Sequence, residues 1–250
     1  MSAVKARRAL DGLGTPEVQW RRWLARNPPP PLEIPHPHRV VAVAPHPDDD
    51  VLGAGGLLHQ LARAGATIVT VAVTDGEASH PRSPTTTPAR LARLRAAESA
   101  VAHARLGIEP GGVRLRLPDG GVEARREELT SHIARHLLPR DWCLAPWDGD
   151  GHPDHGATGA AARAACDATG AALVSYLVWT WHWATPGSPA LPWDRARRVE
   201  LGRGDRAHKR WALRAFRSQT LPLGDGPEDA AILTPAELAH HRRQTEVLLW

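Results

Sequence analysis

Short runs of β-branched and apolar residues alternate along the chain with longer segments whose apolar positions recur at helical spacing. The short runs predict five strands, at residues 40–44, 67–74, 113–117, 142–145 and 173–179. Strands that alternate with helices are typical of a Rossmann-like α/β fold. We therefore predict a doubly wound, mostly parallel sheet with helices on both faces.

The longer segments between these strands predict helices at residues 52–64, 88–106, 122–137 and 155–169. Upstream of the first strand, Thr15 as N-cap and Pro16 in the first helical position indicate the start of another helix, which the proline run from Pro28 ends. Beyond the last strand, the pattern predicts helices at 207–216 and 235–249. The helical segments therefore flank the strands along the whole chain.

A chain of 250 residues fits one α/β domain more comfortably than two. We expect residues 1–35 to form a helical arm with a proline-rich linker and residues 36–180 to form the core that carries the functional site. Residues 181–250 would then form an extension on the substrate side.

Segments rich in His and Asp follow the first and fourth predicted strands, at the end of the strands where a doubly wound sheet binds its ligands. The first reads Pro45-His46-Pro47-Asp48-Asp49-Asp50, and the second reads Asp148-Gly149-Asp150-Gly151-His152-Pro153-Asp154-His155. Carboxylates packed this closely raise one another's pKa values unless a cation lies among them, so the pattern favours a divalent metal. One His and one Asp from the first segment with one His from the second would leave a metal position open for water, which indicates hydrolysis.

Three motifs together resemble the zinc-dependent N-acetylglucosaminyl deacetylases of the PIG-L, or LmbE-like, family. They are His46-Pro47-Asp48-Asp49, Thr74-Asp75-Gly76-Glu77 and His152-Pro153-Asp154-His155. The resemblance covers about residues 40–169 and implies an LmbE-like fold. Separated motifs in this order are much harder to meet by chance than any one of them alone.

The resemblance also implies roles for individual residues. It implies that His46, Asp49 and His155 hold the metal, Zn²⁺ or another divalent transition metal. It further implies that Asp48 is the general base, and that His152 either stabilises the oxyanion or protonates the leaving amine.

Supporting residues follow from the same resemblance. It implies that Asp154 orients an imidazole. Asp50 stands where the family usually has the longer Glu, which leaves open whether the hydrogen bond of that residue survives. Four residues are candidates for substrate contacts: Asp75, Glu77, Arg95 and Asp119. A polar loop is the alternative for Asp75 and Glu77, and a salt bridge is the favoured alternative for Arg95.

These residues predict metal-dependent hydrolysis of an N-acetyl group on a small-molecule amino sugar or glycoside, with release of acetate and a free amine. A dinucleotide-binding oxidoreductase is one alternative, because Gly53, Gly55 and Gly56 follow the first strand and Asp75 ends the second. The acidic first loop argues against it, since it would repel a pyrophosphate.

The other alternative is a non-catalytic carbohydrate- or metal-binding module. Its ligand would contact the tryptophans of the later segment, Trp179, Trp181, Trp183 and Trp193, and the histidines. Aromatic side chains of this kind pack in cores more often than they stack on sugars. Packing is therefore the favoured interpretation of these four residues.

Composition argues against several classes of binding partner. The formal charge of +4 and the pI of about 9.8 come almost entirely from arginines interleaved with acidic residues, which favours solvated helix faces over nucleic-acid binding. Two cysteines, Cys143 and Cys166, do not make a disulfide framework and are expected to be buried thiols. Residues 1–13 lack the apolar core of a signal peptide and no long apolar stretch occurs, so we expect a soluble cytoplasmic protein without a membrane partner. Nothing in the pattern sets an oligomeric state.

Overall fold

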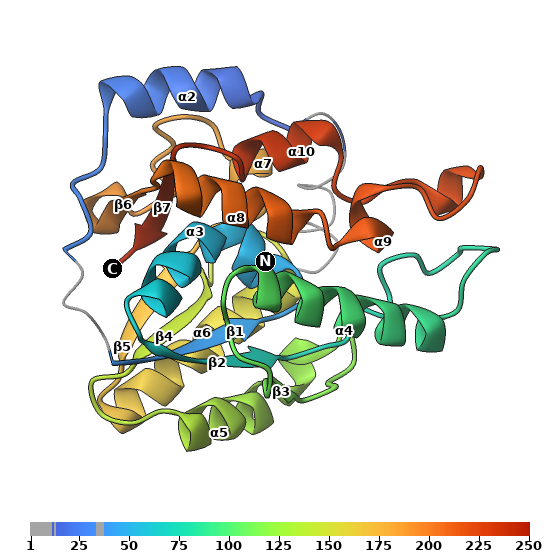
Figure 1. The fold of residues 1–250 in the computed structure, drawn as a ribbon, viewed down its shortest axis with the longest axis horizontal. Coiled ribbons are helices and arrows are strands. Elements are labelled where there is room, and N and C mark those ends of the chain that lie inside the picture. The colour runs from blue at the N-terminus through green and yellow to red at the C-terminus, as the bar shows by residue number, and fades with distance from the viewer. Residues whose placement is uncertain (1–11, 13, 34–37) are drawn as a thin grey trace.

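A seven-stranded sheet forms the centre of the computed structural model, which describes residues 12, 14–33 and 38–250. Its strand order is β3-β2-β1-β4-β5-β7-β6 (Figure 1). The strands are β1 Arg39–Ala44, β2 Thr67–Ala72, β3 Val113–Arg114, β4 Trp142–Pro146, β5 Ala172–Tyr176, β6 Ala196–Glu200 and β7 Thr245–Leu249. The first five run parallel, and β7 pairs antiparallel with both β5 and β6. The predicted α/β fold with a mostly parallel sheet is confirmed.

Helices cover both faces of this sheet (Figure 1). The α-helices are α2 Glu17–Arg26, α3 Asp49–Arg63, α4 Pro88–Arg105, α5 Arg126–His136, α6 Pro153–Thr169, α7 Thr180–Trp183, α8 Arg203–Leu213, α9 Arg217–Thr220 and α10 Pro235–His240. Three 3₁₀ turns add η1 Val122–Arg125, η2 Trp193–Arg195 and η3 Pro227–Asp229. Helices α3, α4 and α8 pack together on one face, and α5 and α6 pack on the other.

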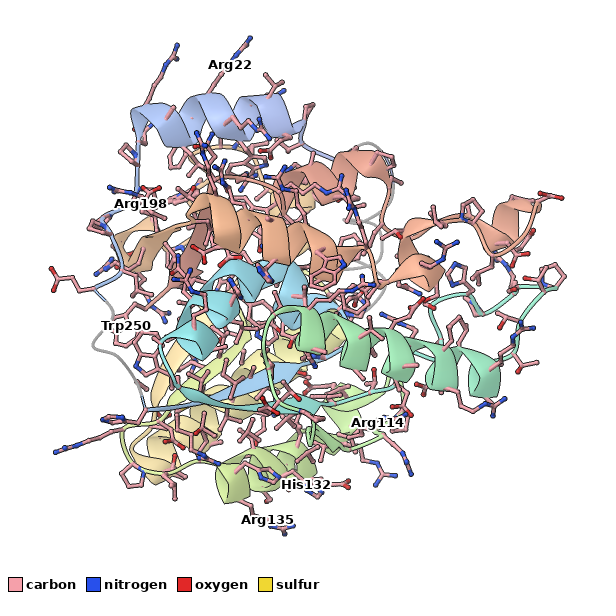
Figure 2. The ribbon with its side chains drawn as sticks, viewed as in Figure 1. Arg22, Arg114, His132, Arg135, Arg198 and Trp250 are labelled. Atoms are coloured by element: carbon pink, nitrogen blue, oxygen red, sulfur yellow. The ribbon has the colours of Figure 1, made fainter. Side chains whose placement is uncertain are left out.

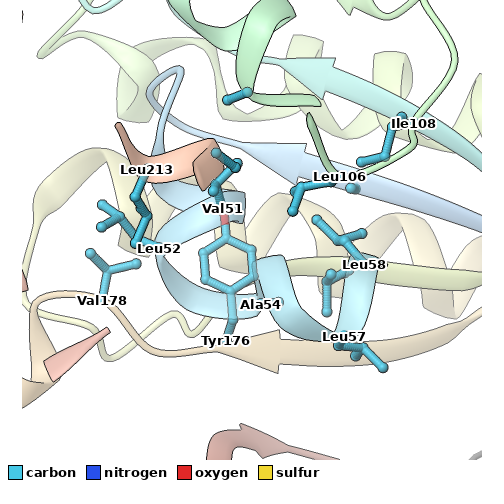
Figure 3. Close-up of a cluster of buried hydrophobic side chains, with 14 of the residues drawn as sticks. Val51, Leu52, Ala54, Leu57, Leu58, Leu106, Ile108, Tyr176, Val178 and Leu213 are labelled. Atoms are coloured by element: carbon cyan, nitrogen blue, oxygen red, sulfur yellow. The ribbon is translucent and has the colours of Figure 1, made fainter. Parts of the chain in front are cut away.

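Alternation along β1 explains why the sheet is buried on both faces. Val40 and Ala42 pack into the cluster beneath α3, while Val41 and Val43 pack into the cluster beneath α5 and α6. Successive side chains of a strand point to opposite faces, so an unbroken apolar run is what a doubly covered strand requires. Figure 3 shows the first of these clusters, in which the ring of Tyr176 lies against α3. Cys143 and Cys166 are free, buried thiols in the second cluster, as expected.

The predicted helix at residues 235–249 was wrong in its second half. Helix α10 ends at His240, and Thr245–Leu249 forms β7 between β5 and β6. The sequence pattern also missed β6. An apolar run of this length fits either a helix or a buried strand, and here pairing with two distant strands decides for the strand.

Two local predictions also differ from the structure. Thr15 does not cap α2, because its hydroxyl donates to the carbonyl of Ala184 at 2.6 Å and Pro16 occupies the N-cap position. Strand β3 is only two residues long. Arg116, close behind it, has a φ of +55°, and this left-handed backbone conformation interrupts a strand.

Arginines occur on several separate parts of the surface. Figure 2 shows Arg22, Arg114, Arg135 and Arg198 at separate edges of the molecule. The positive charge is therefore spread over several elements. None of the helices within the described ranges is both long and apolar enough to cross a bilayer.

Candidate active site

Neighbouring strands bring the two histidine-containing segments together. Strands β1 and β4 pair in parallel, so the loops that follow Ala44 and Pro146 leave the same edge of the sheet. His46 lies in the first loop, and Asp49 is the first residue of α3. His155 lies in the first turn of α6, whose N-cap is His152. Segments about a hundred residues apart in the sequence therefore meet at one point.

At this point, three ligand-type atoms form a small triangle. His46 Nδ1 lies 3.0 Å from Asp49 Oδ2, His155 Nε2 lies 3.1 Å from the same oxygen, and the two nitrogens are 3.3 Å apart. That oxygen also accepts the backbone N–H of His46 at 2.9 Å. All three side chains are buried. Three groups thus compete for a single buried carboxylate oxygen.

Asp150 sets the orientation and tautomer of His155. The Nδ1 of His155 lies 2.8 Å from Asp150 Oδ2, so an N–H there donates to the carboxylate and leaves the lone pair of the neutral ring on Nε2, inside the triangle. Asp150 is fully buried and accepts the backbone N–H groups of Val178, Trp179 and Thr180. Sequence reasoning gave Asp150 no role. The available signal was a carboxylate between two glycines, five residues before a candidate ligand.

Two further carboxylates lie beside the other nitrogen of His46. Its Nε2 is 3.3 Å from Asp119 Oδ1 and 3.4 Å from Asp154 Oδ2. Asp154 is held in turn by the backbone N–H groups of Gly120 and Val122. A proton on Nε2 leaves the Nδ1 lone pair free, so both candidate histidines present unprotonated nitrogens to the triangle when neutral.

The carboxylates of this cluster favour protonation of the imidazoles of His46 and His155. Burial opposes a charge on His155, but Asp49 and Asp150 outweigh burial and raise its pKa to about 9. Burial is likewise outweighed at His46 by Asp119, Asp154 and Asp49, which raise its pKa well above the ordinary value. Burial raises the pKa of Asp119, but the hydrogen bond and charge of His46, the backbone N–H of Ala78 and the charge of Arg95 together lower it to about 2. The cluster therefore attracts positive charge strongly.

Asp48 and Arg95 form an ion pair beside the triangle. Arg95 Nη2 donates to Asp48 Oδ1 at 3.0 Å, and its Nη1 donates to the carbonyl of Gly76 at 2.9 Å. Burial raises the pKa of Asp48, Arg95 offsets part of that effect, and the neighbouring Asp49 raises the pKa again. Asp48 is therefore a carboxylate whose affinity for a proton exceeds that of a solvated one.

His152 differs from the other two histidines because it stays neutral. Burial, followed by the charges on His46 and His155, lowers its pKa to about 3. Its Nδ1 accepts the backbone N–H of Asp154 at 3.2 Å, which assigns the ring proton to Nε2. A nitrogen of each of the three histidines lies within 4.8 Å of the others. His152 is therefore a neutral hydrogen-bond donor at the edge of the triangle.

These residues open onto a cavity of about 570 Å³. Its polar lining is His46, Asp48, Asp49, Ser79, Arg95, Asp119, His152 and Gln219, and the rest of the wall is Leu52, Ala78, Pro81, Gly120, Pro153, Trp179, Ile232 and Leu233. A few convergent polar groups in a largely apolar wall are typical of a small-molecule site. Gln219, Ile232 and Leu233 line the cavity although they follow the core segment in the sequence.

Only one of the four tryptophans in question borders this cavity. Trp179 does so, whereas Trp181, Trp183 and Trp193 pack with Trp20 in a separate apolar cluster. Packing therefore accounts for three of them.

Five candidate residues do not line this cavity: His155 and Asp154, whose contacts are given above, and Asp75, Glu77 and Asp50. Asp75 accepts two N–H groups of Arg114, at 3.0 and 2.7 Å, and borders a different cavity. Glu77 accepts the backbone N–H of Asp119 at 3.0 Å and so holds the Asp119 loop. Asp50 is paired with His103, whose Nε2 lies 2.7 Å away, so the shorter acid at this position keeps a buried hydrogen bond.

Close packing accounts for two glycines that had suggested a dinucleotide site. A Cβ at Gly53 would lie 2.4 Å from the ring of Tyr176, and one at Gly56 would lie 2.5 Å from the side chain of Leu201. Both residues let neighbouring side chains approach α3. Packing therefore accounts for two of the three glycines on which the oxidoreductase alternative was based.

Comparison with known proteins identifies the family. The family described as PIG-L, GlcNAc-PI de-N-acetylase, matches residues 41–166, which contain the whole triangle. The chain belongs to the PIG-L family. This match ends before β5, so the C-terminal part of the sheet and α8 lie outside it.

Individual relatives agree with this family. A 1D-myo-inositol 2-acetamido-2-deoxy-α-D-glucopyranoside deacetylase from Kineococcus radiotolerans is 30% identical over 156 residues, 49% of this chain. The match spans 43% of that relative's length. The conserved protein TT1542 from Thermus thermophilus shares the fold with a TM-score of 0.61 and 24% identity, covering 84% of this chain and 93% of that one. The N,N'-diacetylchitobiose deacetylase from Pyrococcus horikoshii gives 0.56 and 21%, covering 84% and 82%.

Proposed function

We propose that this chain is a metal-dependent N-deacetylase, which hydrolyses the N-acetyl group of an amino-sugar derivative to acetate and a free amine. The observation that carries the proposal is the triangle of His46, Asp49 and His155, of which His46 and Asp49 line the cavity together with Asp48 and His152. Membership of the PIG-L family and the deacetylase activities named for its relatives support the same chemistry.

The donor set of the triangle fits a divalent transition metal. Ligands of a tetrahedral zinc ion, at bond lengths of about 2.0–2.1 Å, lie about 3.3 Å apart, close to the 3.0–3.3 Å separations here. Two imidazoles and one carboxylate suit Zn²⁺ and also accept other divalent transition metals. Such an ion would act as a Lewis acid and lower the pKa of water towards roughly 7.

Asp48 is assigned the proton transfers. Its raised pKa makes the carboxylate a better proton acceptor than a solvated one, and Arg95 holds one of its oxygens in place. In the proposed reaction, Asp48 accepts the proton released when water adds to the amide carbonyl. It then delivers that proton to the nitrogen as the C–N bond breaks, so the amine leaves neutral.

His152 is assigned the stabilisation of the oxyanion. The resemblance left two roles open for this residue, oxyanion donor and acid for the leaving amine. A pKa of about 3 and a ring proton on Nε2 favour the first, because a neutral imidazole donates a hydrogen bond without releasing its proton.

Substrate class is proposed from the wall of the cavity and from the relatives. Trp179 offers a flat apolar face, and Gln219 and Ser79 offer hydrogen bonds, a combination suited to a sugar ring. The similar proteins from Kineococcus radiotolerans and Pyrococcus horikoshii are named as deacetylases of N-acetylated sugars.

Replacing Asp48 by Asn separates catalysis from metal or sugar binding. We expect D48N to retain the metal while acetate release falls about 10²–10⁴-fold, since the candidate ligands are intact and general-base catalysis is lost. Metal content is measured by elemental analysis and acetate release over a panel of N-acetyl amino sugars. D167N, which makes the same change at an exposed position of α6, is the control and should match the wild type. Equal turnover in D48N and D167N would remove Asp48 from the mechanism, and no turnover by the metal-loaded wild type would favour a binding module.

A further inference from the structure

Helix α3, which begins at Asp49, is broken one turn after the candidate ligand. Ala54 has φ −144° and ψ 19°, which lies outside the helical region. A break of this kind frees backbone groups on both sides, and buried backbone groups need partners. A short first piece, Asp49 to Gly53, is therefore followed by a longer second piece that starts beside Gly55.

Two oppositely charged side chains fill this break. Glu246 of β7 accepts the N–H of Gly56 at 2.7 Å and the N–H of Leu57 at 2.8 Å. Lys209 of α8 donates to the carbonyl of Leu52 at 2.8 Å and to Glu246 at 2.6 Å. Both side chains are at most 4% exposed. The freed donors and acceptor are thus satisfied from outside the helix.

The signs of the two charges suit the two helical pieces. Lys209 lies at the carboxyl end of the first piece, and Glu246 lies at the amino end of the second, where the helix dipole favours each charge. His241 also contacts the Leu52 carbonyl, with its Nδ1 at 3.1 Å. The first piece is therefore held at its far end by C-terminal residues.

Small residues in α3 permit this close approach. A Cβ at Gly55 would lie 3.3 Å from the side chain of Lys209, and one at Gly56 would lie 3.0 Å from a carboxylate oxygen of Glu246. In Figure 3 the adjoining residues Val51, Leu52 and Ala54 line the core with Tyr176. The first piece consequently cannot slide along its axis without meeting either this ring or the charged pair.

We infer that Lys209 and Glu246 are positioning residues for the metal centre, acting through the break in α3 to place Asp48 and Asp49. Both lie outside residues 41–166, and neither lines the cavity, so neither contacts a substrate there. The inference rests on the proposed function of the Asp48 and Asp49 turn.

The test compares two identical chemical changes, E246Q and E17Q. Glu17 is also a carboxylate with several donors, its side chain 11% exposed, but it joins α2 to Arg243 and His240. Each protein is stripped of metal and titrated with Co²⁺, whose visible spectrum reports the ligand geometry, and thermal unfolding is recorded in parallel. We expect E246Q to bind Co²⁺ about 10–100-fold more weakly and with an altered spectrum, as a displaced supporting group would cause. We expect E17Q to lose thermal stability and keep wild-type affinity and spectrum.

A kinetic readout accompanies the titration. At saturating metal, E246Q should have a lower kcat with a KM close to that of the wild type, because the residues proposed to contact the sugar, Ser79, Trp179 and Gln219, lie on other segments of the cavity wall. Should E246Q fail to fold, K209M carries the same measurements, since it leaves the Glu246 carboxylate on both amides.

The outcomes separate the two proposals. Wild-type Co²⁺ affinity and spectrum in folded E246Q and K209M would overturn the positioning role while leaving the deacetylase proposal intact. Failure of the wild-type protein to bind Co²⁺ would overturn the metal centre itself, and the positioning role with it.

Discussion

Two buried clusters of carboxylates and histidines lie in this molecule, and they are balanced in different ways. In one, Glu17 of α2 accepts hydrogen bonds from Arg243 and Arg21 and contacts His240 at 2.7 Å. In the other, four carboxylates, Asp49, Asp119, Asp150 and Asp154, contact the imidazoles of His46 and His155, while the third imidazole, that of His152, stays neutral.

The difference lies in the source of the positive charge. Arg243 supplies a permanent cation to Glu17 and lies 4.0 Å from the ring of Trp181, so this cluster is complete. In the second cluster the positive charge comes from protons on His46 and His155, whose pKa values are raised. A cluster whose carboxylate is neutralised by an arginine of the chain joins structural elements together. A cluster in which carboxylates outnumber permanent cations is suited to bind a metal cation.

The largest expected effect comes from removing both imidazoles of the second cluster. H46A/H155A should lose nearly all bound metal and all acetate release above background, because one carboxylate alone holds a transition metal weakly. Elemental analysis and the acetate assay measure both. The matched double variant H132A/H136A on α5, away from the cluster, should behave as the wild type. Metal retained by H46A/H155A would place the binding site elsewhere.

A smaller effect on metal binding is expected from changing Asp150. This residue acts on the triangle through its contact with His155. D150N should weaken metal binding about 10–100-fold, because it disturbs the tautomer and orientation of a ligand imidazole. Chelator competition gives the dissociation constant. D148N, two residues earlier and with a side chain that is 36% exposed beside Arg163, is the control. Equal affinities in D150N and D148N would show that the His155 ring is oriented without Asp150.

Acidity should weaken metal binding by about tenfold for each pH unit per displaced proton. The pKa of His155 is about 9 without metal and that of His46 is also raised, so below pH 9 a metal must displace one to two protons. Affinity should therefore rise steadily from pH 6 to 9, as measured by chelator competition at fixed ionic strength. An affinity independent of pH would mean that neither histidine loses a proton when the metal binds.

The smallest effect is expected in the completed cluster. E17Q should lower the free energy of unfolding at neutral pH by about 1–3 kcal/mol, the cost of leaving buried partners poorly paired. The donors around Glu17 outweigh burial and lower its pKa from 4.5 to about 2, so its stabilisation is complete above pH 4.5 and disappears as the pH falls towards 2. Urea unfolding of both proteins over this pH range tests the expectation. A difference that persists at pH 2 would contradict it.

Local pattern was sufficient for the parallel half of the fold. The predicted strands at 40–44 and 142–145 lie within one residue of β1 and β4, since each is a short apolar run between turn residues. The meeting of His46 with His155 also followed from parallel strands ending at one edge.

Long-range partners explain what local pattern could not supply. Residues 245–249 became a strand because β5 and β6 pair with them. His103 and His182 had no carboxylate at ligand spacing in the sequence, yet the fold brings Asp50 and Glu237 to them. Lys209 and Glu246 contact α3 across 157 and 190 residues. No spacing rule connects positions so far apart.

The break in α3 also buries Lys209, whose amine could be labelled chemically. Lys209 is the sole lysine in residues 12, 14–33 and 38–250, and its side chain is only 4% exposed. Amine-acylating reagents require an accessible, uncharged amine, so modification at Lys209 has to await a transient separation of α8 from α3. The increase in mass at Lys209 over time would therefore measure how often α8 separates from α3.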